Sequence, residues 1–139
     1  CVIGCLVGDK HLENVEFYEM NGDSGMNTIS GVKKGEREYK KVLKRQITID
    51  GFVKENGVVP ELIKIDVEGA EIKVLSGGER VLKKYHPKII LSVHPKHLKD
   101  IGSSLDHLKK TISYLGYEIY NIDGTRVKDE LVSREYYLV

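Results

Sequence analysis

Two short apolar segments in the middle of the chain restrict its fold more than any other feature. Residues 62–65 are Leu-Ile-Lys-Ile and residues 89–93 are Ile-Ile-Leu-Ser-Val, so each is almost free of charged side chains. Between them, apolar side chains recur at helical spacing, at Ala70, Val74 and Leu75. Strands buried on both faces and joined by a helix are typical of a parallel sheet covered by helices. The sequence therefore predicts an α/β fold.

The second half of the chain extends this pattern. The step Ser76-Gly77-Gly78 predicts a break between two short helices, because two glycines in one helix interior cost about 2 kcal/mol. Ser103 is the expected N-cap of a further helix, with Asp106 as its capping-box partner and Gly116 at its end. A strand at residues 117–122 and a closing antiparallel strand at residues 136–139 follow.

The first half is expected to contain more strands. Apolar or alternating residues predict strands at 1–7, 15–20 and 45–49, and Asp50 is a plausible N-cap of a short helix after them. Residues 36–46 are densely charged, which indicates a solvated face or an exposed strand. Neither a linker nor a repeat is present, so residues 1–139 are interpreted as a single domain.

Charge and composition exclude several classes of partner. The chain has 22 Lys and Arg against 21 Asp and Glu, a net charge of +1, so a strong general attraction to nucleic acid is not expected. No segment approaches the roughly 18 apolar residues of a membrane-spanning helix. Cys1 and Cys5 would lie roughly 13 Å apart on a strand, too far for a disulfide. Two buried thiols are expected, and they fit a reducing, cytoplasmic location.

The chain begins with Cys1 rather than Met, which suggests a piece of a longer protein.

The tetrapeptide Gly-Asp-Ser-Gly at residues 22–25 matches a serine-protease motif. A catalytic triad also needs a His and an Asp that the fold places beside the serine, and His11 is the only preceding histidine. A protease is therefore not expected, and surface positions account for His11, His86 and His107.

Acidic and imidazole side chains follow the two apolar strands. Asp66, Glu68 and Glu71 come after the first strand, and His94 and His97 come after the second. Ligands of open α/β sheets bind beyond the carboxyl ends of the strands, so these groups are expected to face one another across a crevice. A carboxylate beside a histidine suits general base catalysis, and the same set suits a divalent metal.

Each of these residues also has a structural interpretation. Asp66 is a plausible N-cap of the following helix, and Glu68 suits the positive end of that helix. Glu71 lies within the helical pattern and is expected to be a solvated side chain. His97 is expected to be exposed, whereas His94 is equally consistent with a structural and a functional role.

Three stretches resemble the FkbM family of S-adenosylmethionine-dependent methyltransferases. They are QITIDGF at residues 46–52, LIKIDVEGAEIKVLSGG at residues 62–78 and KIILSVHP at residues 88–95. Residues 6–10 and 22–29 give weaker support. The resemblance implies a Rossmann-like class I methyltransferase sheet, mostly parallel with a reversed closing strand. The family's first strands and its glycine-rich cofactor loop have no counterpart here, so the resemblance covers the carboxyl-terminal part of the domain.

The resemblance also implies a cofactor, S-adenosylmethionine, and residues that would contact it. Val7, Gly8 and Asp9 would approach the adenine side. Asp66 and Val67 would lie near the methionine end and the transferred methyl group. The pocket would be partial in this chain, because the glycine-rich loop would supply the remainder.

The implied reaction is O-methylation of a hydroxyl on a sugar or small metabolite, and the near-zero net charge suits such a small neutral acceptor. Asp66 is the first candidate for the base that takes the acceptor proton, followed by Glu68 and then His94. Catalysis of this kind depends largely on aligning the acceptor oxygen, methyl carbon and sulfur. No metal is assigned. Ser92 departs from the family, whose members often have Glu at that strand position.

Two other functions remain open from the sequence. The missing glycine loop and Ser92 suit a non-catalytic α/β module that keeps the fold without a complete cofactor site. A metal-dependent hydrolase would use Asp66, Glu68 and His94. Whatever the function, the apolar surface toward the missing strands predicts that this piece aggregates or pairs with a partner. No feature indicates a particular oligomeric state.

Overall fold

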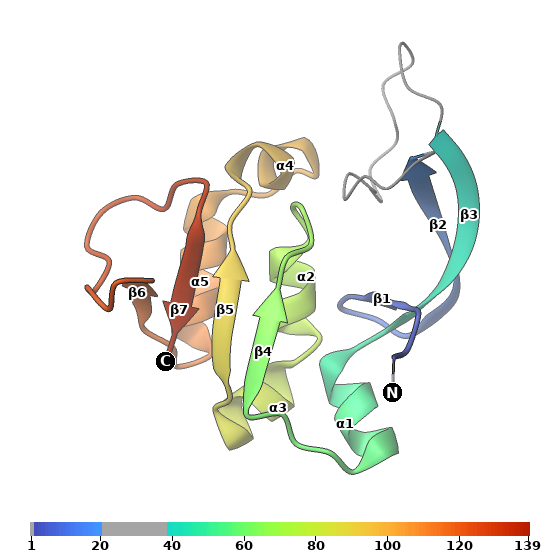
Figure 1. Ribbon diagram of the computed structural model, residues 1–139, viewed down its shortest axis with the longest axis horizontal. Helices are drawn as coiled ribbons and strands as arrows, with labels where there is room; N and C mark the ends of the chain where they lie inside the picture. The colour runs from blue at the N-terminus through green and yellow to red at the C-terminus, as the bar shows by residue number, and fades with distance from the viewer. Residues whose placement is uncertain (1, 21–38) are drawn as a thin grey trace.

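The structure, a computed structural model, describes residues 2–20 and 39–139 and contains two small mixed sheets with helices around them (Figure 1). One sheet has the strand order β1-β3-β2 and the other has the order β4-β5-β7-β6. The strands are β1 (Leu6–Val7), β2 (Leu12–Met20), β3 (Tyr39–Ile47), β4 (Leu62–Ile65), β5 (Lys88–Ser92), β6 (Ile119–Asn121) and β7 (Glu135–Leu138). The helices are α1 (Ile49–Asn56), α2 (Glu71–Ser76), α3 (Glu79–Tyr85), α4 (Pro95–Asp100) and α5 (Leu105–Tyr114).

The α/β class is confirmed, but the expectation of one mostly parallel sheet is wrong. The parallel pairs are β1 with β3 and β4 with β5, whereas β2–β3, β5–β7 and β6–β7 are antiparallel. A parallel pair needs a long crossover, which α2 and α3 provide between β4 and β5. No described helix separates β6 from β7, so these strands run in opposite directions. The reversed closing strand is therefore confirmed as β7.

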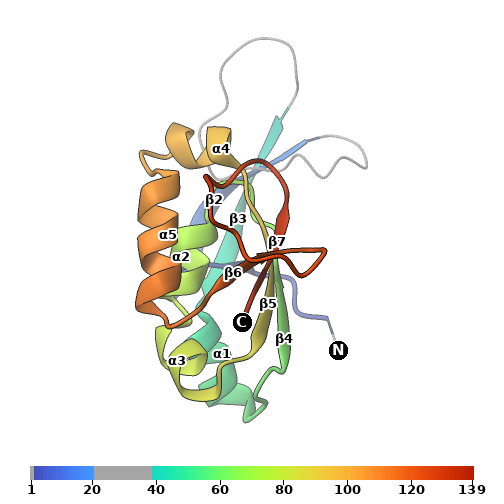
Figure 2. The same cartoon turned by 90° about the vertical axis from the view of Figure 1, so that its left-hand side faces the viewer.

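Helices α2, α3 and α5 lie on one face of the four-stranded sheet (Figure 2). The main hydrophobic core fills the space between these helices and the sheet. Its strand residues with the least exposure are Ile65, Ile89, Leu91, Tyr136 and Leu138. Because these side chains alternate along each strand, one sheet face carries the core.

The opposite face of this sheet is not covered by any described helix (Figure 2). Leu62 and Lys64 alternate with the inward side chains of β4, and Leu62 is 55% exposed. The expectation that β4 is buried on both faces is therefore wrong. The apolar composition of β4 is typical of a strand covered on both faces. Among the described residues, however, helices pack against only one of its faces.

The helix boundaries follow the predicted breaks but use different caps. The division between α2 and α3 at residues 76–78 is confirmed, and His86 ends α3 in a left-handed conformation. The N-cap of α1 is Thr48 rather than Asp50, because the Thr48 hydroxyl accepts the Gly51 N–H at 2.9 Å. Asp50 lies two residues after this cap, in the first turn of α1, and its carboxylate accepts N–H groups of α3 instead.

The cap of α5 is displaced by one residue from the prediction. Ser104, not Ser103, has the extended backbone of an N-cap, and its hydroxyl accepts the His107 N–H at 3.1 Å. Asp106 is consequently in the first turn and is not a capping-box partner. The apolar stripe of α5 is as expected, with Leu108 and Ile112 buried.

The first sheet is a charged arm beside the main body (Figure 1). Strand β3 confirms the exposed strand expected from the charged segment, and its lysines pair with β2, as in Lys44 Nζ to Glu19 Oε1 at 2.8 Å.

The first strand is shorter than expected, so Cys5 precedes β1 and is half-buried rather than buried. Cys1 and the glycine-rich loop with its Gly-Asp-Ser-Gly tetrapeptide lie outside the described residues. No described helix is long and apolar enough to cross a membrane.

Candidate functional site

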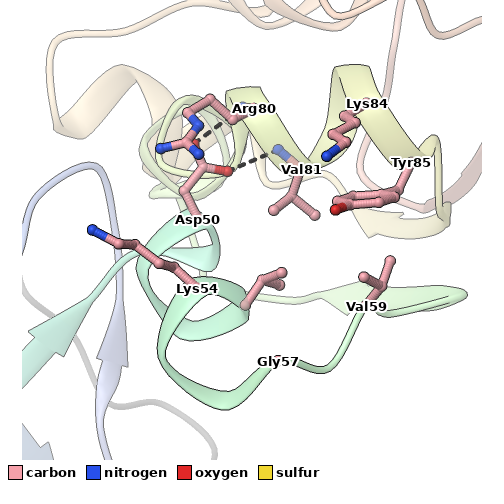
Figure 3. A pocket seen from close by; sticks show the side chains of 9 residues that line it. Asp50, Lys54, Gly57, Val59, Arg80, Val81, Lys84 and Tyr85 are labelled. Carbon is pink, nitrogen blue, oxygen red and sulfur yellow. Dashed lines mark hydrogen bonds between the residues drawn. The ribbon is translucent and has the colours of Figure 1, made fainter.

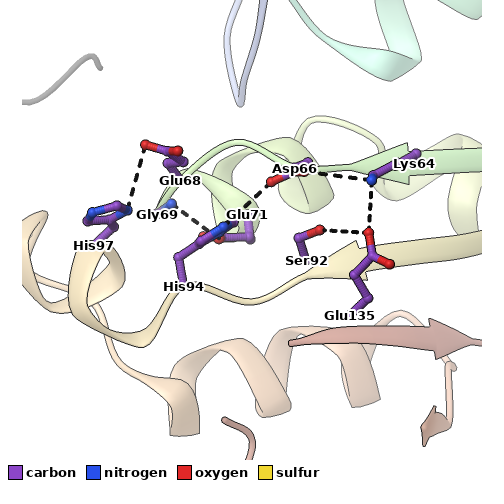
Figure 4. Close-up of polar contacts among 9 residues, drawn as sticks. All are labelled: Lys64, Asp66, Glu68, Gly69, Glu71, Ser92, His94, His97 and Glu135. Carbon is purple, nitrogen blue, oxygen red and sulfur yellow. Dashed lines mark hydrogen bonds and ion pairs between the residues drawn. The ribbon is translucent and has the colours of Figure 1, made fainter. Parts of the chain in front are cut away.

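Polar side chains meet where β4 and β5 end, as the sequence predicts. The two strands are parallel and in register, with Ile65 opposite Leu91, so the residues that follow them leave the same edge of the sheet. Asp66 follows β4 with a side chain 48% exposed, and His94 follows β5 with a side chain 25% exposed. Asp66 Oδ1 lies 3.5 Å from His94 Nε2 (Figure 4).

Glu71 is the group that sequence reasoning placed wrongly. It was expected to be solvated, yet its side chain is fully buried. Its Oε1 accepts the Gly69 N–H at 3.1 Å and lies 2.9 Å from His94 Nδ1, whereas its Oε2 has no hydrogen-bond partner in the described part of the chain. Glu71 lies four residues before the buried Leu75, so helical spacing could have identified its inward direction.

An unusual turn carries these groups from β4 to α2. Glu68 has φ 45° and Gly69 has φ 105°, so two successive residues have positive φ. A Cβ atom at Gly69 would lie 2.8 Å from the backbone of His97, so glycine lets the turn pack against α4. Helix α2 begins only at Glu71 with Ala70 as its N-cap. The interpretation of Asp66 as the cap of this helix is therefore wrong.

The two histidines stack beside this turn. The rings of His94 and His97 have centroids 5.9 Å apart. Glu68 Oε2 lies 3.9 Å from His97 Nδ1, too far for a hydrogen bond, and that nitrogen is buried without a partner among the residues described. His97 is thus only half-exposed, against the expectation of a free surface side chain.

A second polar group on the open sheet face adjoins this site. Lys64 Nζ lies 2.8 Å from Glu135 Oε1 and 3.7 Å from Asp66 Oδ2 (Figure 4). The hydrogen bond between Lys64 and Glu135 raises the pKa of the Lys64 ammonium group and lowers the pKa of the Glu135 carboxyl group. The Ser92 hydroxyl is 3.4 Å from the same Glu135 oxygen. The Glu135 carboxylate, which comes from β7, therefore lies beside Ser92. Ser92 is the strand position at which the sequence comparison with the family expects Glu.

Sequence reasoning missed both Lys64 and Glu135. Lys64 is the lone charged residue of an apolar strand, which is a signal that could have identified it. Glu135 is 71 positions away along the chain, and only the antiparallel pairing of β7 with β5 brings it to this site.

The residues expected near the adenine lie beside the helical break. The Gly8 N–H donates to the Ile47 carbonyl at 2.9 Å, and a Cβ atom at Gly77 would lie 2.0 Å from the Gly8 carbonyl oxygen. Val7 and Val67 both pack against the main core, and Asp9 is exposed. No hydrogen bond or ion pair within the described ranges joins Asp9 to Asp66.

Two hollows among the described residues lie beside β4 and α1, and the first also reaches Lys64. An apolar groove of about 380 Å³ runs along β4, between it and the amino-terminal segment. Its lining includes Cys5, Val7, Ile47, Phe52, Leu62 and Ile63. A smaller hollow of about 220 Å³ lies between α1 and α3, with Lys54, Arg80 and Lys84 at its rim (Figure 3). The described residues include no cluster of three or more His, Cys, Asp or Glu side chains arranged to hold a metal ion.

Parallel strands joined by helices, with acids and imidazoles after the strand ends, define an α/β domain whose site lies at the carboxyl edge of a sheet. The chain belongs to the FkbM methyltransferase family, because the model of the methyltransferase FkbM domain matches residues 5–119. The resemblance carried by residues 46–52, 62–78 and 88–95 is therefore confirmed.

A solved structure supports the same fold. The crystal structure of methyltransferase FkbM from Methylobacillus flagellatus KT aligns over 100% of this chain with a TM-score of 0.52 and 20% identity. The present chain spans 28% of the length of that protein. A search of curated proteins found no match.

Proposed function

We propose that this chain forms part of an S-adenosylmethionine-dependent methyltransferase that methylates a hydroxyl of a sugar or small metabolite. The observation that carries the proposal is the Asp66–His94 pair at the carboxyl edge of β4 and β5, within a chain of the FkbM family. Two proton-accepting side chains, partly exposed and 3.5 Å apart, suit removal of a proton from an acceptor hydroxyl.

The site also offers groups for the cofactor. S-adenosylmethionine supplies a methyl group on a positively charged sulfur. Asp66 carries a half-exposed carboxylate, and the buried carboxyl of Glu71 lies behind it, so the acidic side chains at this edge suit a cationic sulfur. Val67 would contribute apolar contact beside Asp66, and the turn of Val7, Gly8 and Asp9 would approach the adenine.

The reaction balances with one base. The acceptor oxygen forms a bond to the methyl carbon as the carbon–sulfur bond breaks, and the electron pair of that bond stays on sulfur. The acceptor proton passes to the base and later to water. The chain's part is to hold the acceptor in line and to take this proton, with Asp66, Glu68 and His94 as the candidate bases.

Calorimetric titration of S-adenosylmethionine into the full-length protein tests the proposal. We expect saturable binding that Asp66→Asn weakens at least several-fold, because the variant removes a charge beside the proposed methionine end. Asp106→Asn is the matched control, since Asp106 is in the first turn of α5 and takes no part in the site. Absence of binding at millimolar cofactor by a folded protein would contradict the proposal.

One observation bears on each alternative. The hydrolase would need Asp66, Glu68 and His94 as metal ligands, and no metal-holding cluster exists in the part of the chain that the structure describes. The non-catalytic module is favoured by Ser92, but Glu135 restores a carboxylate beside it. Cofactor binding by the full-length protein distinguishes a methyltransferase from the module.

A further inference from the structure

We propose that Glu71 is a positioning residue that holds His94 with its proton on Nδ1, and that His94 Nε2 is therefore the atom that accepts the acceptor proton. The inference rests on the proposed methyltransferase function. It reverses the order of candidate bases expected from the sequence, in which Asp66 came first and His94 last. It also assigns a role to Glu71, which the sequence reasoning treated as a surface side chain.

The burial of Glu71 is the first observation. A fully buried carboxylate is costly unless it is hydrogen-bonded, and Glu71 Oε1 has two close partners, the Gly69 N–H at 3.1 Å and His94 Nδ1 at 2.9 Å. An ionised carboxylate has no proton to donate. Glu71 Oε1 already accepts the Gly69 N–H, so it acts as an acceptor, and its hydrogen bond to His94 requires a proton on Nδ1, which leaves a lone pair on Nε2.

The direction of the ring is the second observation. Its Nδ1 faces the buried carboxylate, and its Nε2 faces the partly exposed Asp66 at 3.5 Å (Figure 4). When Nε2 takes a proton, the imidazolium has Glu71 on one side and Asp66 on the other. Carboxylates on both sides stabilise that cation, as the buried carboxylate does in a Ser-His-Asp triad. The stacked His97 ring lies against this side chain and limits its rotation.

The surrounding backbone is built to keep this contact. Glu71 is the first residue of α2, and Gly69 both bonds its carboxylate and packs against His97 of α4. His94 is the N-cap residue of α4 and comes two residues after β5. The turn after β4 and the helix after β5 are thus joined through the Glu71–His94 pair.

Nitrogen NMR of the histidine rings in the full-length protein tests the inference. Ring 15N shifts distinguish a protonated from an unprotonated nitrogen, so they report the tautomer of the neutral ring. We expect His94 to carry its proton on Nδ1 and to have an unprotonated Nε2. The opposite tautomer in the wild-type protein would overturn the inference without any variant, because Glu71 would then have to be the donor.

A matched pair of variants adds a second arm. Glu71→Met keeps the length of the side chain, suits a buried position and removes the acceptor, so the His94 proton should shift toward Nε2. Glu68→Met makes the same change at a carboxylate near His97 and should leave the His94 tautomer as it is. An unchanged His94 tautomer in a folded Glu71→Met protein would show that Glu71 does not hold the ring.

The demethylated product S-adenosylhomocysteine separates this inference from the proposed function. Saturation with it should move the His94 Nε2 resonance, whereas His86, which packs against Tyr117 away from the site, should not respond. Binding without any change at His94 would overturn its role as proton acceptor. Absence of binding would overturn the proposed function and that role together, while the tautomer in the same sample would still decide whether Glu71 holds the ring.

Discussion

Gly77 shows how a single residue controls the approach of two segments. It ends α2 with ordinary helical dihedral angles, φ −70° and ψ −9°, so any residue could adopt its backbone conformation. A Cβ atom there would nevertheless lie 2.0 Å from the Gly8 carbonyl oxygen and 3.2 Å from Asp9 Cα. The glycine is needed for space, and it is what lets the proposed cofactor turn lie against the helical break.

Gly77→Ala should therefore lower the free energy of unfolding by about 1–3 kcal/mol, because the methyl group meets backbone that cannot rotate away. The higher helix propensity of alanine, worth about 1 kcal/mol, works in the opposite direction, so a net loss isolates the contact. Urea denaturation of the full-length protein measures the change. Gly4→Ala is the control and should stay within about 0.5 kcal/mol, since nothing lies within 4 Å of its added Cβ. If Gly77→Ala and Gly4→Ala had equal free energies of unfolding, the close approach of Gly77 to the Gly8 carbonyl would be refuted.

At the scale of elements, Asp50 joins two helices that are not adjacent in the chain. Its carboxylate accepts the N–H groups of Arg80 and Val81 at 3.1 Å and 2.9 Å, at the start of α3 (Figure 3). These N–H groups have no partner within the helix, so a side chain from α1 supplies the cap that Gly78 lacks. The Asp50 N–H in turn donates to the Gly77 carbonyl at 3.0 Å.

Asp50→Ala should cost about 0.5–2 kcal/mol, the usual value of a lost N-cap. Asp50→Asn keeps an acceptor oxygen and should lose clearly less. Asp106→Ala removes an acidic residue from the first turn of α5 without removing a cap, so its loss should be smaller than that of Asp50→Ala. Thermal unfolding of the three variants gives the order, and a larger loss for Asp106→Ala would contradict this role for Asp50.

Tyr117 links the end of α5 to the turn before β5. It is 5% exposed, its hydroxyl donates to the Pro87 carbonyl at 2.8 Å, and its ring packs at a tilt of 39° against His86 with centroids 4.1 Å apart. Burial raises the pKa of Tyr117 from 10.0 to about 12, because the phenolate loses hydration in the core. The folded state then keeps this proton at a pH where the unfolded chain releases it.

Stability should therefore decline as the pH rises from 10 toward 12, and Tyr117 should account for about 2 kcal/mol of that decline at most. Tyr117→Phe should flatten the decline relative to wild type, although the variant starts lower because the Pro87 carbonyl loses its donor. Tyr85→Phe, at a 43% exposed tyrosine whose hydroxyl makes no hydrogen bond within the described residues, is the control and should retain the wild-type slope. Urea denaturation at several alkaline pH values compares the slopes, and identical slopes for wild type and Tyr117→Phe would refute the assignment.

At the scale of the whole molecule, the four-stranded sheet has an open side. Strand β4 pairs with β5 on one edge, and no described strand pairs with its other edge. The apolar groove of about 380 Å³ runs along that edge, and Leu62 is 55% exposed beside it. An unpaired edge beside apolar surface is a template for strand addition.

We predict that residues 1–139 in isolation associate or aggregate through this edge. Leu62→Lys should raise the concentration at which association begins, because a charge on an edge strand blocks pairing. Val132→Lys makes the same change at a 45% exposed residue away from β4 and should leave association unchanged. Light scattering over a concentration series measures both variants. A monodisperse monomer at high concentration would contradict the prediction.

Some of the fold was predictable because it depends on short-range patterns. The helical break at residues 76–78, the exposed strand β3 and the parallel β4–β5 pair each follow from periodicity, glycine placement or charge within one segment. The meeting of Asp66 with His94 was predictable too, since parallel strands bring their following residues to one edge. The division into two mixed sheets was not, because it depends on which distant strands pair.

The sequence by itself determined the α/β class, the family and the edge of the sheet at which the polar residues gather. Only the tertiary structure decided that Glu71 is buried against His94 and that Glu135 reaches Lys64 and Ser92. The physical reason is that a strand or helix follows from neighbouring residues, whereas the burial of a charge depends on side chains that are far away in sequence. Glu71 is separated from His94 by 23 positions, and Glu135 is separated from Ser92 by 43.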